Sequence, residues 1–114
     1  MCGRISREKG DYEIAWEGWS PRQISLNLGD TSYNIGPGRD VCVVIATDAP
    51  EVQEMYWGLI RPFTKKGMPT PINARSETAL EKPMFKSLMK SKRCVVPATG
   101  YYEWQRDGKA KQPY

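Results

Sequence analysis

The sequence predicts an α+β domain that consists mostly of antiparallel strands with a few helices. Two apolar runs rich in β-branched residues, 41–47 and 52–59, are separated by the turn-forming segment 48–50, a pattern typical of consecutive strands. The dipeptide Asp107-Gly108 is a strong hairpin signal. Residues 76–90 instead show the three- and four-residue spacing of apolar positions that indicates an amphipathic helix.

The elements before residue 40 are predicted from short local signals. Residues 2–6 are expected to form a short strand, and residues 11–19 an irregular or helical piece. Residues 20–28 begin with Ser-Pro, which can cap and open a short helical turn. Residues 34–38, Asn-Ile-Gly-Pro-Gly, predict a turn, because glycine permits a positive φ and Pro37 fixes its own φ.

The segments after residue 60 predict a loop, one helix and several short strands. Residues 61–72 hold three prolines and two lysines and are expected to form the loop. The helix should place Phe85, Leu88 and Met89 on one apolar face. Strands are expected at 94–97, at 101–105 and from residue 111 onward, and the runs 41–47 and 94–96 have the composition of central strands.

Length and composition limit the classes of protein to consider. A chain of 114 residues forms one domain at most, and 39% apolar residues with four Trp and six Tyr are enough for a core. No run approaches the roughly 20 apolar residues of a membrane span. The first residues lack the apolar segment of a secretion signal. We therefore expect a soluble, cytoplasmic protein without a membrane partner.

The three cysteines and the absence of histidine argue against a metal site. Cys42 and Cys94 lie in apolar runs and are expected to be small buried hydrophobic residues in strands. No cysteines are paired at metal-ligand spacing, and the sequence has no His. We expect neither a metal nor an organic cofactor.

The net charge of +4 is distributed unevenly along the chain. Residues 1–60 carry a net charge of −4 and residues 61–114 one of +8. Such a basic half suits a nucleic-acid backbone, but an ordinary soluble surface can have the same composition. The basic half contains these residues among others: Lys65, Lys66, Arg75, Lys82, Lys86, Lys90, Lys92 and Arg93.

Several short segments, in order and at plausible spacing, together resemble one family. They are Met1-Cys2-Gly3-Arg4, residues 33–38, residues 57–60, residues 73–78 with 81–85, and residues 93–98, 100–104 and 111–114. The family is SRAP (SOS response-associated peptidase-like), whose members shield abasic sites in DNA. The resemblance implies a barrel-like antiparallel fold and a partial domain over residues 1–114. The C-terminal half, including the family's catalytic histidine, would then come from another segment or chain.

Cys2 is the residue for which the resemblance implies the central chemistry. A free N-terminal cysteine presents an amine with a pKa of about 7.7–8.0 beside a thiol with a pKa of about 8.5, so both nucleophiles are partly available at neutral pH. An aldehyde can form an imine with the amine, and the thiol can close it into a thiazolidine ring. The resemblance implies that Cys2, after self-removal of Met1, bonds in this way to abasic sites in single-stranded DNA. The alternative is an incidental cysteine.

Two further residues match supporting groups of the family. Asn73 resembles the amide that holds the N-terminal residue, although alone it would be read as a turn residue. Glu103 resembles the carboxylate that moves protons, and it lies between two aromatic residues, Tyr102 and Trp104. Without the family, Glu103 would be a solvated strand position.

Five residues are the candidate DNA contacts. Arg4 and Arg75 resemble the family's phosphate-binding arginines. Trp57 and Phe63 would offer surfaces on which unpaired bases stack, with a core position as the alternative for Trp57. The family commonly has a Trp near the position of Phe63. Pro37, in the matched turn, is assigned to the same surface.

Two other functions remain open at this point. A non-covalent module for single-stranded DNA would need the charge and the aromatic residues but not Cys2. An inactive remnant of the family would neither bind nor crosslink DNA.

Overall fold

The computed structural model describes residues 2–10, 29–46, 50–108 and 110–113, and the elements expected within 11–28 lie outside these residues. The described part contains eight strands and two helices. The strands are β1 (Ile5–Arg7), β2 (Ser32–Ile35), β3 (Asp40–Ala46), β4 (Pro50–Tyr56), β5 (Cys94–Val95), β6 (Gly100–Tyr101), β7 (Trp104–Asp107) and β8 (Ala110–Pro113). The helices are α1 (Ser76–Ala79) and α2 (Pro83–Ser91).

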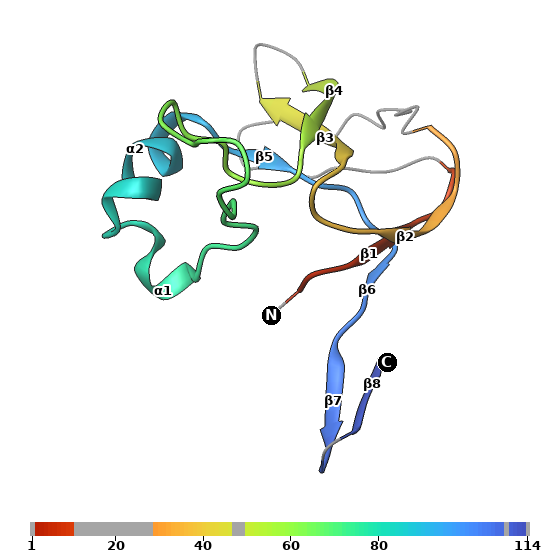
Figure 1. Cartoon of the computed structure of the whole chain (residues 1–114). Helices are drawn as coiled ribbons and strands as arrows, with labels where there is room; N and C mark the ends of the chain where they lie inside the picture. Colours follow the sequence, from red (N-terminus) through yellow and green to blue (C-terminus); the bar gives the residue numbers. More distant parts are fainter. Residues whose placement is uncertain (1, 11–28, 47–49, 109, 114) are drawn as a thin grey trace.

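The strands form three small antiparallel sheets (Figure 1). Their orders are β2-β1-β6, β4-β3-β5 and β7-β8. The predicted antiparallel α+β class is therefore confirmed. The barrel-like arrangement is not present among the described strands, because none of the three sheets closes on itself.

The hairpin of β3 and β4 forms the centre of the structure. Its seven residue pairs run from Asp40 opposite Tyr56 to Ala46 opposite Pro50. β3 is buried on both faces, and Val43 and Val44 are each only 2% exposed. β-branched side chains suit such a strand because they pack well on a pleated surface.

One apolar cluster joins the two larger sheets. Ile5 of β1 and Ile35 of β2 pack with Val41 and Val43 of β3. Half-buried side chains complete this cluster, and they are Cys2, Ile45 and Trp57. The N-terminal strand is thereby fixed against the central hairpin.

The predicted helix at 76–90 is divided into α1 and α2, because Pro83 begins a second helix. Proline has no N–H to donate and restricts the preceding residue, and Lys82 is accordingly extended, with a ψ of 125°. Pro83 lies in the first turn of α2, where that missing donor costs no helical hydrogen bond. Phe85 and Leu88 are half-buried, as expected, whereas Met89 is exposed.

Three predicted strands are shorter than expected. β4 ends at Tyr56 instead of residue 59, because Gly58 takes a φ of +151° and the chain leaves the sheet there. β5 consists of two residues at the edge of its sheet and is not a central strand. The strand predicted at 101–105 is divided, since β6 pairs with β1 and β7 pairs with β8.

The hairpin of β7 and β8 projects away from the other elements (Figure 1). Its turn at Gly108 has a φ of +57°, which confirms the hairpin predicted from Asp107-Gly108. All four residues of β8 are exposed. The loop predicted at 61–72 is also confirmed, because it contains no helix or strand.

Candidate functional site

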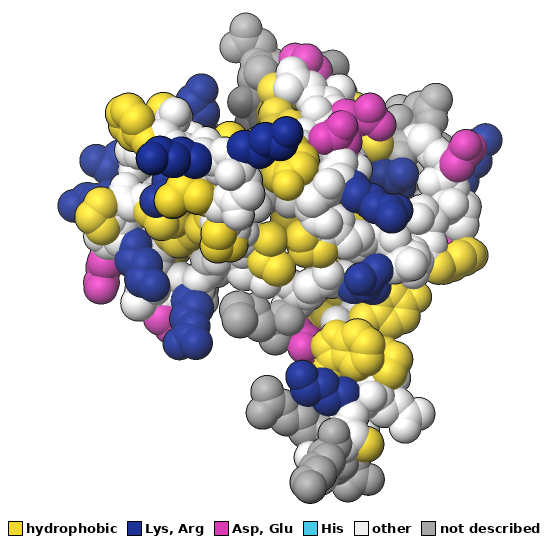
Figure 2. All heavy atoms as spheres, in the orientation of Figure 1, with side chains coloured by type: hydrophobic (Ala, Val, Ile, Leu, Met, Phe, Trp, Pro, Cys, Tyr) yellow, Lys and Arg dark blue, Asp and Glu magenta, His cyan; other side chains and the backbone are white. Residues whose placement is uncertain are grey.

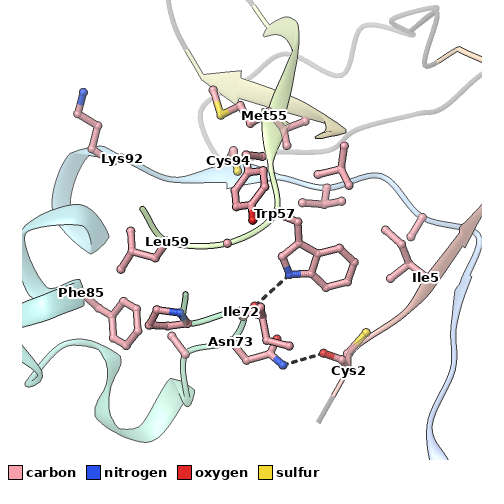
Figure 3. Close-up of a pocket in the computed structure, with 18 residues that line it drawn as sticks. Cys2, Ile5, Met55, Trp57, Leu59, Ile72, Asn73, Phe85, Lys92 and Cys94 are labelled. Carbon is pink, nitrogen blue, oxygen red and sulfur yellow. Dashed lines mark hydrogen bonds between the residues drawn. The ribbon is translucent and has the colours of Figure 1, made fainter. Parts of the chain in front are cut away.

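The site is centred on a hydrogen bond between two residues that are 71 positions apart. The side-chain amide Nδ2 of Asn73 donates to the backbone carbonyl of Cys2 over 2.8 Å (Figure 3). The bond is partly buried, so water competes with it less than with an exposed bond. It holds Cys2, which lies just before β1, against the end of the loop formed by residues 58–73.

The Cys2 side chain is held beside the core. Cys2 is half-buried and packs against the cluster around Ile5 and Val43. Its Sγ donates a weak hydrogen bond of 3.7 Å to the carbonyl of Arg4. The thiol therefore has a defined position while part of the residue remains accessible.

Cys2 and Asn73 both line a cavity of about 530 Å³ (Figure 3). Most of its other walls are apolar, including Val43, Trp57 and Ile72. A hollow with apolar walls and a few polar groups is the usual form of a ligand site. Its volume is of the size that holds a small molecule or part of a larger one.

The loop that carries Asn73 is attached to the end of β4 at two points. The N–H of Leu59 donates to the carbonyl of Pro71 over 2.8 Å. The indole Nε1 of Trp57 donates to the carbonyl of Ile72 over 3.0 Å. The position of Asn73 thus depends on contacts with residues just after β4.

Arg4 lies on the outside of the same segment. Its Nη1 donates to Oδ1 of Asn34, and its guanidinium carbon and nitrogens lie 3.5–3.6 Å from the place where a Cβ on Gly36 would be. The guanidinium group therefore lies beside the Gly36 backbone while the residue stays exposed. Such an exposed, oriented group can still contact an anion through its remaining donors.

Arg75 and Glu103 lie near the site but are not in the cavity wall that the described residues form. Arg75 is exposed and directly precedes α1, two residues after Asn73. Glu103 is half-buried. The backbone N–H of Tyr102 donates to the carbonyl of Arg4 over 2.9 Å, which brings Glu103 next to the first residues of the chain.

The remaining candidate DNA contacts differ in exposure. Phe63 is 91% exposed, so its ring is accessible to a base. Trp57 is half-buried, and its N–H is already used by Ile72. Pro37 is half-buried in the predicted turn, where the N–H of Gly38 donates to the carbonyl of Trp57 over 3.0 Å.

The cysteine predictions are confirmed for one residue and wrong for the other. Cys42 is buried in β3, as expected. Cys94 is exposed, because β5 is a short edge strand that leaves one side uncovered. Its thiol is nevertheless partly desolvated, and this burial raises the pKa of Cys94. Among the described residues, no group of three or more metal-ligating side chains comes together.

Basic side chains lie exposed on α2 and on the residues just before and after it, on the side of the molecule that carries the two helices (Figure 2). The acidic residues of α1 and its C-terminal turn, Glu77 and Glu81, are the nearest opposite charges in sequence. The basic residues of this surface are Lys82, Lys86, Lys90, Lys92 and Arg93. No helix of the described chain is long and apolar enough to cross a membrane.

The contact of Asn34 with Arg4 and that of Trp57 with Ile72 were not predicted. Both pairs join residues far apart in sequence, and nothing in the local pattern indicates which amide or indole will meet which partner. The only signal was that Asn34 and Trp57 each lie in a segment that carries the family resemblance.

The comparisons with known proteins agree with that resemblance. The family model for SOS response associated peptidase (SRAP) matches residues 1–114. The chain is 42% identical over 117 residues to the abasic site processing protein YoaM of Bacillus subtilis, covering 99% of this chain and 52% of that protein. It is 33% identical over 118 residues to the abasic site processing protein YedK of Escherichia coli, covering 100% of this chain and 52% of that protein.

A vertebrate relative is also similar. The chain is 40% identical over 98 residues to the abasic site processing protein HMCES of Gallus gallus, which covers 73% of this chain and 29% of that protein. The chain thus spans about half the length of these bacterial relatives and a smaller share of the vertebrate one.

Proposed function

The chain belongs to the SOS response associated peptidase family, and we propose that its complete protein bonds covalently through Cys2 to abasic sites in single-stranded DNA. The names of its relatives supply the substrate, since several are abasic site processing proteins. The observation that carries the proposal is the hydrogen bond of 2.8 Å from Asn73 to the carbonyl of Cys2. It holds in place a residue whose free amine and thiol can together capture an aldehyde in a ring.

The proposed reaction begins with the release of Met1. Water adds to the carbonyl carbon of Met1, the peptide bond to Cys2 breaks, and methionine leaves as the Cys2 amine becomes free. The family description as a peptidase is consistent with such a step. Until this hydrolysis occurs, the Cys2 nitrogen is an amide and cannot form an imine.

The free amine then attacks the aldehyde carbon of a ring-opened abasic sugar. Loss of water gives an imine, and addition of the Cys2 thiol to the imine carbon closes a five-membered thiazolidine, with a proton passing to nitrogen. We assign the proton transfers to Glu103, a half-buried carboxylate next to the N-terminal segment. The oxidation state of every atom is unchanged, so no redox partner is required.

The surroundings of Cys2 fit a DNA strand with a missing base. Arg4 and Arg75 each lie two residues from one partner of the Asn73–Cys2 bond, and both are exposed. Their guanidinium groups would contact phosphates on the two sides of the lesion. Phe63, whose side chain is 91% exposed, offers a surface on which a neighbouring base can stack.

The test is denaturing gel electrophoresis after incubation with single-stranded DNA that contains one abasic site. The 114-residue chain is assayed alone and together with a polypeptide that matches the remaining half of the Bacillus subtilis relative. We expect a DNA adduct that survives denaturant, and we expect Cys2→Ala to abolish it while salt-sensitive binding remains. Absence of an adduct in both assays would contradict the proposal.

Cys94→Ala is the matched control, because the Cys94 side chain is exposed whereas the remaining cysteine, Cys42, is buried. Burial raises the pKa of its thiol, so Cys94 has less thiolate than an ordinary cysteine at neutral pH. The adduct should persist in this variant. If binding is lost on denaturation in wild type and in both variants alike, the chain is a non-covalent DNA-binding module.

A further inference from the structure

The indole of Trp57 stands between the central hairpin and the loop that ends at Asn73 (Figure 3). We infer that Trp57 is a positioning residue: its N–H holds the 72–73 backbone so that the Asn73 amide meets the Cys2 carbonyl. This inference rests on the proposed role of Cys2. It assigns to Trp57 a task that differs from stacking on a DNA base.

Trp57 is itself fixed beside the central hairpin. Its backbone N–H donates to the carbonyl of Arg39 over 2.9 Å, and its carbonyl accepts from the N–H of Gly38 over 3.0 Å. Its ring packs against the apolar cluster that contains Val41 and Val43. The indole is therefore anchored on two sides before it contacts the loop.

The loop needs such an anchor because it has no regular structure of its own. Residues 58–73 contain no helix or strand, so no ladder of backbone bonds fixes the direction of Asn73. The two bonds that reach its end come from Trp57, at Ile72, and from Leu59, at Pro71. The Trp57 bond is the nearer one, since Ile72 directly precedes Asn73.

The two hydrogen bonds therefore act in series. Trp57 fixes the Ile72 carbonyl at 3.0 Å, and Asn73 then reaches Cys2 at 2.8 Å. Loss of the indole N–H would let Asn73 move while it leaves the ring's apolar packing in place. A small displacement of a positioning group lowers a rate strongly, by up to about 100-fold per ångström.

Trp57→Phe tests this inference, because phenylalanine keeps one aromatic ring against the apolar cluster and removes the N–H donor together with the second ring of the indole. We expect the rate of adduct formation to fall about tenfold, with the affinity for intact single-stranded DNA unchanged. In an Asn73→Ala background, Trp57→Phe should cause no further loss, since both residues act through one contact. Independent, multiplying losses would overturn the inference, as would an unchanged rate in the single variant.

Nuclear magnetic resonance of the full chain gives a second readout that needs no DNA. The Trp57 indole proton should exchange slowly with water in the wild type. The side-chain amide protons of Asn73 should have the chemical shift of a hydrogen-bonded group, and Trp57→Phe should abolish that shift. Fast indole exchange in the wild type would refute the inference even if the variant fails to fold. If the wild type forms no adduct, the proposed function fails, and these spectra alone decide the role of Trp57.

Discussion

The backbone N–H of Tyr102 donates to the carbonyl of Arg4 over 2.9 Å, which continues the pairing of β6 with β1 by one residue. The hydroxyl of Tyr102 also donates to the carbonyl of Tyr33 over 3.0 Å. These two bonds tie the segment around residue 102 to β2 and to the residue that precedes β1. Glu103, the next residue, is thereby kept close to the segment that starts with Cys2.

Glu103→Gln should slow adduct formation and leave DNA affinity within a few-fold of the wild type. The amide has nearly the same shape as the carboxylate but cannot take up a proton at neutral pH. A general acid–base contribution is worth about 100-fold or more in rate, so a clear loss is expected. Single-turnover kinetics on abasic DNA, with fluorescence anisotropy for binding, measure both quantities. A large loss of affinity at an unchanged rate would instead make Glu103 a binding residue.

Arg75→Ala should weaken binding to all single-stranded sequences alike. A phosphate contact carries no sequence information, and its removal should reduce the slope of log affinity against log salt by about one. Titrations at several salt concentrations measure this slope. Arg75→Lys is the matched variant: it should keep the slope and lose only the part of the affinity that depends on the planar guanidinium group. A change confined to one DNA sequence would contradict a phosphate-binding role.

The sequence predicted best those elements whose own side chains determine them. The strand β3 and the Asp107-Gly108 turn both formed as expected. The β-branched composition of the run favours a strand, and the glycine permits the positive φ of the turn, so both follow from residues within the element itself. The helix predicted at 76–90 is divided at Pro83. The prediction missed this division because it gave the apolar spacing across Pro83 more weight than the proline itself. Cys94 was misassigned because its exposure depends on which strand lies beside β5.

The candidate site shows the same limit. The resemblance indicated Cys2 and Asn73, and the structure brings these two residues into contact. The roles of Trp57 and Asn34 depend on hydrogen bonds across 15 and 30 residues, which no periodicity encodes. Tertiary contacts of this kind appear only once the chain is folded.

Gly58→Ala should destabilise the fold and displace the loop that follows. Gly58 has a φ of +151°, and an added Cβ would lie 2.8 Å from the Tyr56 ring and 3.0 Å from the Thr70 hydroxyl. Strained backbone of this kind costs about 1–3 kcal/mol in unfolding free energy. Urea unfolding of the wild type and of Gly58→Ala measures this loss of unfolding free energy. Gly10→Ala is the control, because nothing lies within 4 Å of its Cβ and its φ is not positive, so its midpoint should stay near the wild type.

The β7–β8 hairpin should cause the 114-residue chain to self-associate. Among the described strands, β7 and β8 pair only with each other, and a two-stranded hairpin is marginally stable in water. Its base carries Tyr101 and Trp104, which are 67% and 53% exposed. Unpaired strand edges beside exposed aromatic side chains favour pairing with another chain.

Sedimentation velocity over a range of protein concentrations measures this association. We expect species larger than a monomer at micromolar concentration, and a shift toward the monomer in Trp104→Lys, because a charge at the edge opposes pairing. Gln53→Lys is the matched control, since it adds the same charge to β4, away from the hairpin. A wild-type chain that stays monomeric at every concentration would show that the hairpin edge is protected in solution. An equal shift toward the monomer in both variants would show that net charge, and not the hairpin, controls the association.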